Sequence, residues 1–415
     1  MLNWKDYFLD DLAYYYNGMA FKPNDWKSDG VKIIRIEQIN NPNGGYDYYQ
    51  GVFPDNNSID NGDLIFSWSA TLKVVIWKYG KGVLNQHLFK VIPKDFINKH
   101  YLYFLLDYNM PKLSDTSHGS TMKHIKRGEL KKYKVSVPEY PIQQKIAKIL
   151  STIDRQIEKT ETIIAKYQAV KQGMIQDLFT RGIDLTTGEL RPRYEDAPEL
   201  YKDSPLGMIP REWEAKFVGD IIRIKHGHGF EGKFFTDEPN GYILLTPGNF
   251  SVEGGLYFTN SNTKYYKGIF PSEFILNNGD VLNVMTDLTK EMAILGKTVI
   301  LDKYEKVLHN QRIGKVIFDE SGLDKTFLNN LLNSDIVIDE IKKTATGTTV
   351  RHTSPTKIYN AKIGLPKKPE QKLIGNRIEQ MDNLISDERQ TLNKCSLLKQ
   401  GLMSDLLSGK VEVNN

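Results

Sequence analysis

The strongest constraint on the fold of this 415-residue chain is that its second half repeats its first. Short matches follow the same order in both halves, which is the signature of an internal duplication. The offset between matched residues only grows along the chain, from 209 to 228: Trp4 with Trp213, Asp63 with Asp280, Asn85 with Asn310, Gly119 with Gly347 and Gln143 with Gln371. Because the offset stops growing near Gly119, the second copy is the longer one only within its first 120 or so residues. Each copy therefore has a part of variable length followed by a part of fixed length.

The fixed part of each copy carries the pattern of a long helix. In each copy we take ten positions spaced alternately four and three residues apart, starting at Ile146 or Ile374. Eight of the ten residues are apolar, and the two polar exceptions occupy the same positions in both copies. A 3.5-residue period sustained this long is typical of a coiled-coil seam. Two copies with matched polar slots favour packing of the helices against each other, antiparallel. The predicted seam residues are Ile146, Leu150, Ile153, Ile157, Ile164, Met174, Leu178, Ile374, Ile378, Met381, Ile385, Leu392, Leu402 and Leu406.

The sequence also predicts where both helices begin and end. Pro141 and Pro369 suit the first helical turn, where a missing N–H costs little. Gly182 and Gly409 suit the C-terminal stops. Each helix would then run for ~40 residues, roughly 60 Å.

The variable parts contain short β-rich runs bounded by turn signals, such as Asn-Gly-Asp at 61–63 and 278–280, and indicate mixed α/β structure. We therefore expect mixed α+β globular domains with two long antiparallel coiled-coil helices and an internal pseudo-two-fold duplication. The expected divisions are a first variable domain (1–140), a first helix (141–182), a linker (183–209), a second variable domain (210–368), a second helix (369–409) and a tail (410–415).

Basic residues gather just ahead of each predicted helix. The net charge of +4 is too small to indicate nucleic acid by itself. However, 123–134 holds six basic residues and one acidic residue, and 351–368 holds five basic and no acidic residues. Glycine, hydroxyl, histidine and cationic residues in these segments make them our candidates to contact DNA; the alternative is a structural turn with solvated cations. The candidates are Ser120, Thr121, Lys123, His124, Lys126, Arg127, Thr348, Thr349, Arg351, His352 and Lys357.

A weaker set of candidates follows Asn85 and Asn310. Side-chain amides can read adenine, which makes Gln86, His87, Gln311 and Arg312 possible readers. Because both copies share Asn-Gln, a common structural or backbone role is favoured for that dipeptide.

Several kinds of chemistry have no motif in the sequence. A single Cys excludes a disulfide framework and a Cys-based zinc site, and it suits a reducing cytoplasm. No apolar run approaches the ~20 residues of a membrane helix, and the N-terminus does not have the pattern of a signal peptide. Phosphate-binding loops and the Asn-Pro-Pro-aromatic motif of amino-methylation are absent, since Asn41-Pro42-Asn43 fails the latter. His226-Gly227-His228 is more typical of a turn than of a metal site. We therefore expect no catalytic centre, no metal and no bound cofactor in this chain.

The order of variable domain and fixed helix, repeated twice, resembles the specificity subunit of type I restriction–modification systems. The resemblance rests on the residues at the start of each helix, Val137–Ile146 and Leu365–Lys372, which look like the family's Pro-x-x-x-(Glu/Gln)-Gln motif. Lys171-Gln172-Gly173-Met174, Lys399-Gln400-Gly401-Leu402 and the segment Gly207–Trp213 add to it. The resemblance covers essentially the whole chain.

The resemblance implies a reader of double-stranded DNA that is not itself an enzyme. Each variable domain would recognise one half of a bipartite site, and the paired helices would set the spacing and hold two methyltransferase subunits. Those subunits would bring S-adenosylmethionine and methylate adenine, and a separate restriction subunit would use ATP and Mg²⁺ to cut DNA.

Two other classes of function stay open from the residues alone. A coiled-coil scaffold without DNA reading would explain the helices but not the basic clusters beside them. A self-contained DNA-modifying enzyme would need a metal or S-adenosylmethionine site that the sequence does not reveal.

Overall fold

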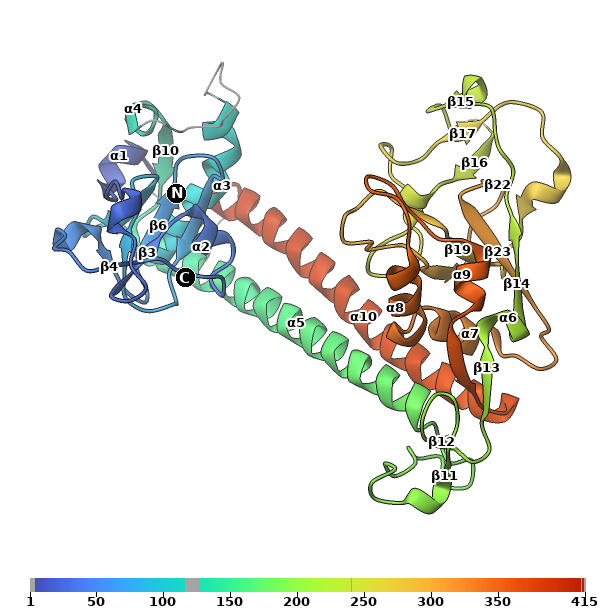
Figure 1. Cartoon of the computed structure of the whole chain (residues 1–415). Coiled ribbons are helices and arrows are strands. Elements are labelled where there is room, and N and C mark those ends of the chain that lie inside the picture. Colours follow the sequence, from blue (N-terminus) through green and yellow to red (C-terminus); the bar gives the residue numbers. More distant parts are fainter. Residues whose placement is uncertain (1–3, 116–124, 126, 240, 412, 414–415) are drawn as a thin grey trace. The chain divides into compact units, whose positions relative to one another are not determined.

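The structure is a computed structural model. It describes residues 4–115, 125, 127–239, 241–411 and 413, without the side chains of residues 114, 115 and 127. The chain forms two compact units, Met1–Ile163 with Glu388–Asn415, and Ile164–Asp387 (Figure 1). Both units are mixed sheet and helix, which confirms the predicted fold class. Within the described residues, no helix is both long and apolar enough to cross a membrane.

Among its described residues, the first unit contains a two-stranded sheet, two four-stranded sheets and four α-helices besides its share of the long pair. The sheet orders are β1-β10, β2-β9-β6-β7 and β4-β3-β8-β5. The strands are β1 Lys5–Phe8, β2 Ala13–Asn17, β3 Val31–Ile34, β4 Tyr48–Tyr49, β5 Ser58–Ile59, β6 Leu64–Ser67, β7 Lys73–Ile76, β8 Gly82–Leu84, β9 Leu88–Pro93 and β10 Lys134–Val137. The helices are α1 Leu9–Leu12, α2 Ile36–Asn40, α3 Lys99–Asp115 and α4 Arg127–Leu130.

The second unit repeats this arrangement and enlarges it. Its sheet β14-β23-β19-β21 has the order of β2-β9-β6-β7, and β17-β16-β22-β18 has the order of β4-β3-β8-β5 with β15 added at the edge. Three strand pairs complete it, β13-β25, β11-β12 and β20-β24. The strands are β11 Tyr201–Lys202, β12 Ile209–Pro210, β13 Glu214–Phe217, β14 Ile222–His226, β15 Phe235–Thr236, β16 Tyr242–Leu245, β17 Tyr265–Tyr266, β18 Ile275–Leu276, β19 Val281–Val284, β20 Thr286–Asp287, β21 Thr298–Ile300, β22 Val307–His309, β23 Ile313–Phe318, β24 Arg351–His352 and β25 Lys362–Leu365. The helices are α6 Val218–Ile221, α7 Lys325–Leu332, α8 Asp335–Thr344 and α9 Pro355–Tyr359.

The two long helices have the length and ends that the sequence predicted. Helix α5 (Tyr140–Thr180) has 41 residues and α10 (Lys368–Leu407) has 40, each with proline at its second position. Gly182 and Gly409 follow their C-termini with φ of +66° and +72°, a left-handed conformation that glycine adopts without steric cost.

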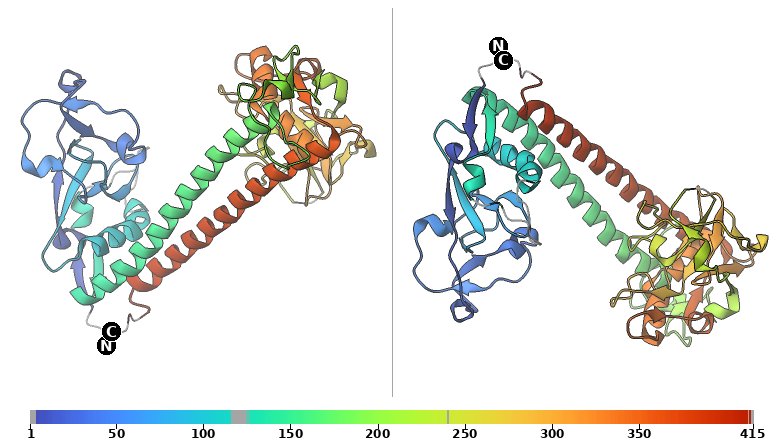
Figure 2. Two further views of the ribbon diagram at one scale, coloured as in Figure 1. Left: turned by 90° about the horizontal axis from the view of Figure 1, so that it is seen from below. Right: turned by 90° about the horizontal axis from the view of Figure 1, so that it is seen from above.

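Within each unit, the parts of α5 and α10 that belong to it run side by side in opposite directions (Figures 1 and 2). In the first unit, Ile146 and Leu150 share a core with Met403 and Leu406. In the second unit, residues at the other end of α5 share a core with the start of α10: Met174, Leu178, Ile374 and Ile378. Every predicted seam residue is buried or half-buried, because the 3.5-residue period keeps these side chains on the face shared by the helices.

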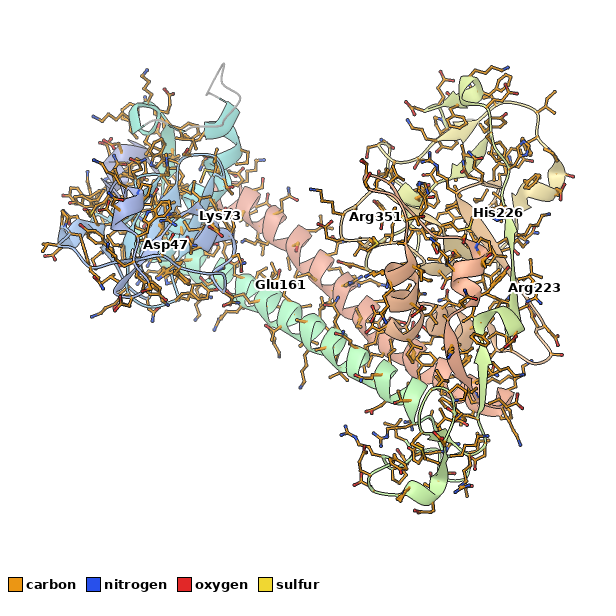
Figure 3. All side chains as sticks on the ribbon, in the orientation of Figure 1. Asp47, Lys73, Glu161, Arg223, His226 and Arg351 are labelled. Atoms are coloured by element: carbon orange, nitrogen blue, oxygen red, sulfur yellow. The ribbon has the colours of Figure 1, made fainter. Side chains whose placement is uncertain are left out.

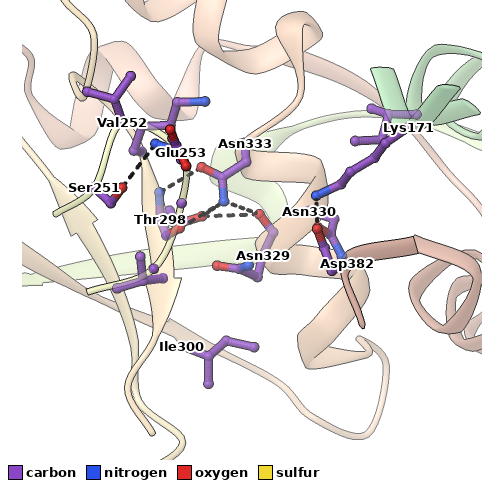
Figure 4. A pocket seen from close by; sticks show the side chains of 15 residues that line it. Lys171, Ser251, Val252, Glu253, Thr298, Ile300, Asn329, Asn330, Asn333 and Asp382 are labelled. Atoms are coloured by element: carbon purple, nitrogen blue, oxygen red, sulfur yellow. Dashed lines mark hydrogen bonds and ion pairs between the residues drawn. The ribbon is translucent and has the colours of Figure 1, made fainter. Parts of the chain in front are cut away.

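The polar seam slots at Lys171 and Lys399 hold equivalent ion pairs. Lys399 lies 2.7 Å from Asp154 in the first unit, and Lys171 pairs with Asp382 in the second (Figure 4). The two lysines are 228 residues apart, as are the two aspartates. A lysine on one helix is therefore matched to an aspartate on the other, which favours one antiparallel register.

A buried glutamine anchors the start of each long helix to its variable domain. Gln143 accepts from the Asn98 N–H (2.8 Å) and donates to the Pro138 (2.9 Å) and Phe96 (3.1 Å) carbonyls. Gln371 makes the equivalent bonds to the Asp324 N–H and to the Pro366 and Gly322 carbonyls. Both are 1% exposed, so the glutamine satisfies backbone groups that water cannot reach.

The segment between the copies is fixed by a buried ion pair inside the second unit. The Glu370 carboxylate, 2% exposed, accepts from both terminal nitrogens of Arg191, from the Ile183 N–H (2.9 Å) and from the Trp213 indole (3.1 Å). Gly182 lies against this cluster, where an added Cβ would come within 2.1 Å of Glu370 Oε1. A charge this buried needs these partners to offset its lost hydration.

Candidate nucleic-acid interface

In the second copy, the predicted DNA-contacting segment forms a tight hairpin. Thr346 and His352 form a bridge across it, and Gly347 turns the chain with φ +98°. A Cβ at Gly347 would lie 1.9 Å from the Val350 carbonyl oxygen, so the turn requires glycine there. Strand β24 of this hairpin pairs antiparallel with β20, which joins the hairpin to the domain.

The hairpin and the helix α9 that follows it each carry a cation that no carboxylate neutralises among the described residues. Arg351 (Figure 3) donates one N–H to the Gly347 carbonyl (2.6 Å), and its Nε has no partner there. Lys357 lies 3.4 Å from the Thr346 hydroxyl. Asp287 lies opposite Arg351 on β20, but its carboxylate accepts hydrogen bonds from backbone N–H groups of its own loop. The guanidinium and the ammonium are thus available for an anion such as a DNA phosphate, or for a base edge.

The other candidates of this segment lie on the same hairpin. Thr348, Thr349 and His352 are exposed. The His352 Nδ1 lies 3.4 Å from the Thr286 hydroxyl, which fixes the ring against β20. Hydroxyls and an imidazole beside the cations add hydrogen-bonding groups that can face base edges.

The structure adds a loop that our sequence analysis did not single out. Residues 285–297 join β19 to β21 and include β20, beside the hairpin. Asp287 shapes this loop by accepting from the N–H groups of Thr289, Ile294 and Leu295, and it leaves Leu288 68% exposed. A signal was present in the sequence, because the offset between copies rises from 217 at Asp63 to 225 at Asn85. That rise located an insertion without indicating where it lies in space.

In the first copy, the equivalent candidates fall largely outside the described residues: Ser120, Thr121, Lys123, His124 and Lys126. Arg127 begins α4, and its side chain is not described. The described residue between them, Ile125, donates its N–H to the Trp68 carbonyl (2.9 Å). In the second copy, the Thr353 N–H donates to the Met285 carbonyl (3.0 Å). Both segments are therefore attached to the end of an equivalent strand, β6 or β19.

The weaker candidates lie on a turn whose backbone explains the repeated Asn-Gln. A Cβ at Gly18 would lie 2.2 Å from the Asn85 carbonyl oxygen, and one at Gly227 would lie 2.2 Å from that of Asn310. Each asparagine side chain accepts an N–H two residues ahead, from His87 (3.4 Å) or Arg312 (3.1 Å). Both asparagines thus make the same local backbone contacts.

The side chains after these asparagines differ in their surroundings. Gln86, Gln311 and Arg312 are exposed, whereas His87 is half-buried with its ring 5.7 Å from the Trp68 ring. Only the exposed three could reach a partner directly.

The histidines give no support for a metal site. Within the described part of the chain, no group of three or more His, Cys, Asp or Glu could hold a metal ion. His228 packs against Phe230 and Phe274, with ring centroids 5.0 Å apart in both cases. Buried His309 donates its Nε2–H to the Ile313 carbonyl (2.8 Å), and burial lowers its pKa to about 4. These rings therefore act in packing.

Comparisons with known proteins agree with this geometry. The family model described as "Type I restriction modification DNA specificity domain" matches residues 1–167 and 210–395. The Methanocaldococcus jannaschii type I restriction enzyme MjaVIII specificity subunit is 27% identical over 364 residues, covering 86% of this chain and 81% of that protein. The Escherichia coli EcoBI specificity subunit is 21% identical over 99% of this chain and 86% of its own length.

A solved structure shares the fold. The S subunit of a type I restriction–modification system from M. genitalium superposes with a TM-score of 0.58 at 12% identity, covering 100% of this chain and 97% of that one. The family model matches two segments that together make up most of the sequence, one in each copy. The chain therefore belongs to the type I restriction–modification specificity subunits, the non-catalytic subunits through which those systems recognise DNA.

Proposed function

We propose that each variable domain reads one half of a bipartite DNA site, and that the segment ahead of each long helix faces the DNA. The observation that carries this proposal is that Arg351 on the hairpin and Lys357 on α9 have no carboxylate partner among the described residues. In the first copy the same role falls to the basic residues Lys123, Lys126 and Arg127, of which Lys123 is the one that corresponds to Arg351. Phosphate contacts from such cations fix the register of a domain on the duplex, while neighbouring polar side chains distinguish bases.

The long helices would set the distance between the half-sites and bind two methyltransferase subunits. Apolar side chains on the outer faces of α5 and α10 support this, because Val170, Leu384, Leu397 and Leu398 are between 45% and 59% exposed. Exposed apolar residues on a helix are typical of a surface that meets another protein. The methyltransferase subunits would supply S-adenosylmethionine, and restriction subunits would supply the ATP and Mg²⁺ chemistry, in a cytoplasmic complex.

Salt-dependent DNA binding tests the DNA-facing hairpin. In the variant Arg351→Ala with Lys357→Ala, we expect binding to a specific duplex to weaken about tenfold and the slope of log K against log salt to fall by about two. The control is Lys264→Ala, since Lys264 is already paired with Asp237 at 2.5 Å. An unchanged salt slope would show that the hairpin does not contact DNA.

Helix length tests the spacing role. A seven-residue insertion after Thr160 and after Glu388 keeps the seam in phase and lengthens each helix by about 10 Å. We expect a longer spacer between unchanged half-sites when methylated sites are mapped in cells with the complete system. An active variant with the original spacer would exclude the helices as the ruler.

A further inference from the structure

Both copies contain a turn that holds one aliphatic side chain almost fully in solvent. Val52 is 95% exposed and Ile269 is 99% exposed. They occupy equivalent positions, 217 residues apart, in the segments Tyr48-Tyr49-Gln50-Gly51-Val52-Phe53-Pro54 and Tyr265-Tyr266-Lys267-Gly268-Ile269-Phe270-Pro271. Isolated exposed aliphatic residues are common on protein surfaces, but here the same exposure occurs twice at one structural position.

The framework of the turn is the same in both copies. A Cβ at Gly51 would lie 2.3 Å from the Tyr49 hydroxyl, and one at Gly268 would lie 2.5 Å from the Tyr266 hydroxyl. The residue before Val52 or Ile269 is therefore a glycine because a tyrosine ring lies against it. The tyrosine is held in turn by a phenylalanine, with ring centroids 5.2 Å apart for Phe21–Tyr49 and 4.8 Å apart for Phe230–Tyr266. This packing presents the aliphatic side chain outward from a fixed base.

The charges around the turn differ from those on the Arg351 hairpin. In the second copy, Lys267 pairs with Glu238 (2.8 Å), Lys264 with Asp237 (2.5 Å) and Lys225 with Glu273 (2.7 Å). In the first copy, Gln50 donates to Asp29 (2.7 Å). In the second copy, where these lysines are already neutralised, the surface has little attraction for the phosphate backbone. An apolar tip with a polar rim is the usual anatomy of a protein–protein contact.

The turn and the Arg351 hairpin are built on different strands of the second unit, since the turn follows β17 whereas the hairpin is joined to β20. Figure 3 shows Arg351 well separated from Arg223 and His226. Close to the turn, Glu273, four residues after Ile269, pairs with Lys225 of β14. The turn is therefore not part of the strand pair that carries Arg351.

The repetition itself indicates what kind of partner this is. Two domains that read different half-sites have no reason to share an apolar base contact, whereas a partner present in two identical copies would meet both domains in the same way. We propose that Val52 and Ile269 are anchor residues, each of which inserts into an apolar socket on one methyltransferase subunit. This proposal rests on the proposed function, because it takes the two methyltransferase subunits as the partners.

The test is titration of the full chain with its purified cognate methyltransferase subunit. We expect Val52→Ser and Ile269→Ser each to weaken one of the two binding events about tenfold, and the double variant to weaken both, because each change removes one buried aliphatic side chain. The exchanges Val52→Ile and Ile269→Val, which place in each copy the residue of the other, should bind nearly as well as the wild type. The matched control is Val252→Ser, an exposed aliphatic residue on another loop, 62% exposed, which should change nothing.

Two results would overturn this inference. One is unchanged methyltransferase binding in the double variant. The other is weaker binding of the chain alone to duplex DNA with methyltransferase binding intact, which would make the turn a DNA contact. Failure of the wild-type chain to bind the methyltransferase subunit at all would instead contradict the proposed function, so the two failures are distinguishable.

Discussion

In the first copy, residues 68–72 join β6 to β7, whereas in the second copy residues 285–297 join the equivalent strands β19 and β21 and add strand β20 between them. The strands on either side of this connection are the same in number, order and direction. The longer connection pairs with the hairpin that carries Arg351. Part of the difference between the copies, the rise in offset from 217 at Asp63 to 225 at Asn85, thus lies where we propose that DNA is read.

Ion pairs inside the two copies, in contrast, are the same. Asp63 pairs with Lys90 at 3.1 Å, and Asp280 pairs with Lys315 at 2.7 Å, at equivalent positions. Partly buried ion pairs of this kind tolerate little change, because replacing one partner leaves the other without its counter-charge. The comparison teaches that duplicated recognition domains can diverge on their loops while these internal contacts remain.

Some interior positions do differ, and they show what the shared framework permits. Leu84 in the first copy corresponds to His309 in the second, and both are fully buried. Asp107 corresponds to Asn333. Burial raises the pKa of the Asp107 carboxyl, while Lys399 and Lys73 oppose that rise. Asn333 instead exchanges hydrogen bonds with the Thr298 backbone, at 2.9 Å and 2.8 Å.

Replacement of a whole domain should have the largest effect. If the loops of each copy read independently, exchanging residues 1–138 for the equivalent domain of another specificity subunit will change one half-site completely and leave the other half-site as it was. Mapping of methylated sites in cells with the complete system measures this. Simultaneous change of both half-sites would show that the two copies do not read independently.

Replacement of the two anchoring glutamines, Gln143 and Gln371, should have the second-largest effect. Gln143→Leu and Gln371→Leu each leave a buried N–H and two carbonyls without a partner, so we expect each to lower the free energy of unfolding by about 2–4 kcal/mol. Denaturant unfolding of the full chain measures the loss, and exposed Gln144→Leu is the control. Losses that differ widely between the two variants would contradict the equivalence of the two helix anchors.

His309 should make the stability of the second copy depend on pH in the acid range. Leu84, which occupies the equivalent position in the first copy, does not titrate and should have no such effect. The pKa of His309 is about 4 in the folded chain and near 6.5 when unfolded, so the unfolded state binds the proton first as the pH falls. Stability from this residue is fully present above about pH 6.5 and declines as the pH falls toward 4, by up to about 3 kcal/mol. His309→Leu should remove that part of the pH dependence, whereas exposed His226→Leu should keep it. A variant with the wild-type pH profile would contradict this account.

The seam ion pairs should have the smallest effect on stability. Lys399→Asp and Lys171→Asp each replace an attraction by a repulsion, which we expect to cost about 1 kcal/mol because these groups are partly exposed. The reversed pairs, Lys399→Asp with Asp154→Lys and Lys171→Asp with Asp382→Lys, should recover most of the loss. Thermal unfolding measures both. Recovery in neither pair would show that these charges do not specify the register of the helices.

Most of the scaffold could be predicted from the sequence, because its signals are local or repeated. The 3.5-residue period placed the seam of α5 and α10, and proline and glycine marked their ends, since each of these depends only on backbone geometry within a few residues. The matched Gln143 and Gln371 were visible as a repeat. Their role was not, because it depends on carbonyl groups that folding brings to them from another segment.

The candidate interface was only partly predictable for the same reason. The sequence determined the duplication, the helices and the family, and it located the basic segment that contains Arg351 and Lys357. Only the tertiary structure decided that these cations lack a carboxylate among the described residues, that the 285–297 loop lies beside them, and that Val52 and Ile269 point into solvent. Exposure and ion pairing depend on which distant segments meet, and that is settled by packing rather than by the order of residues along the chain.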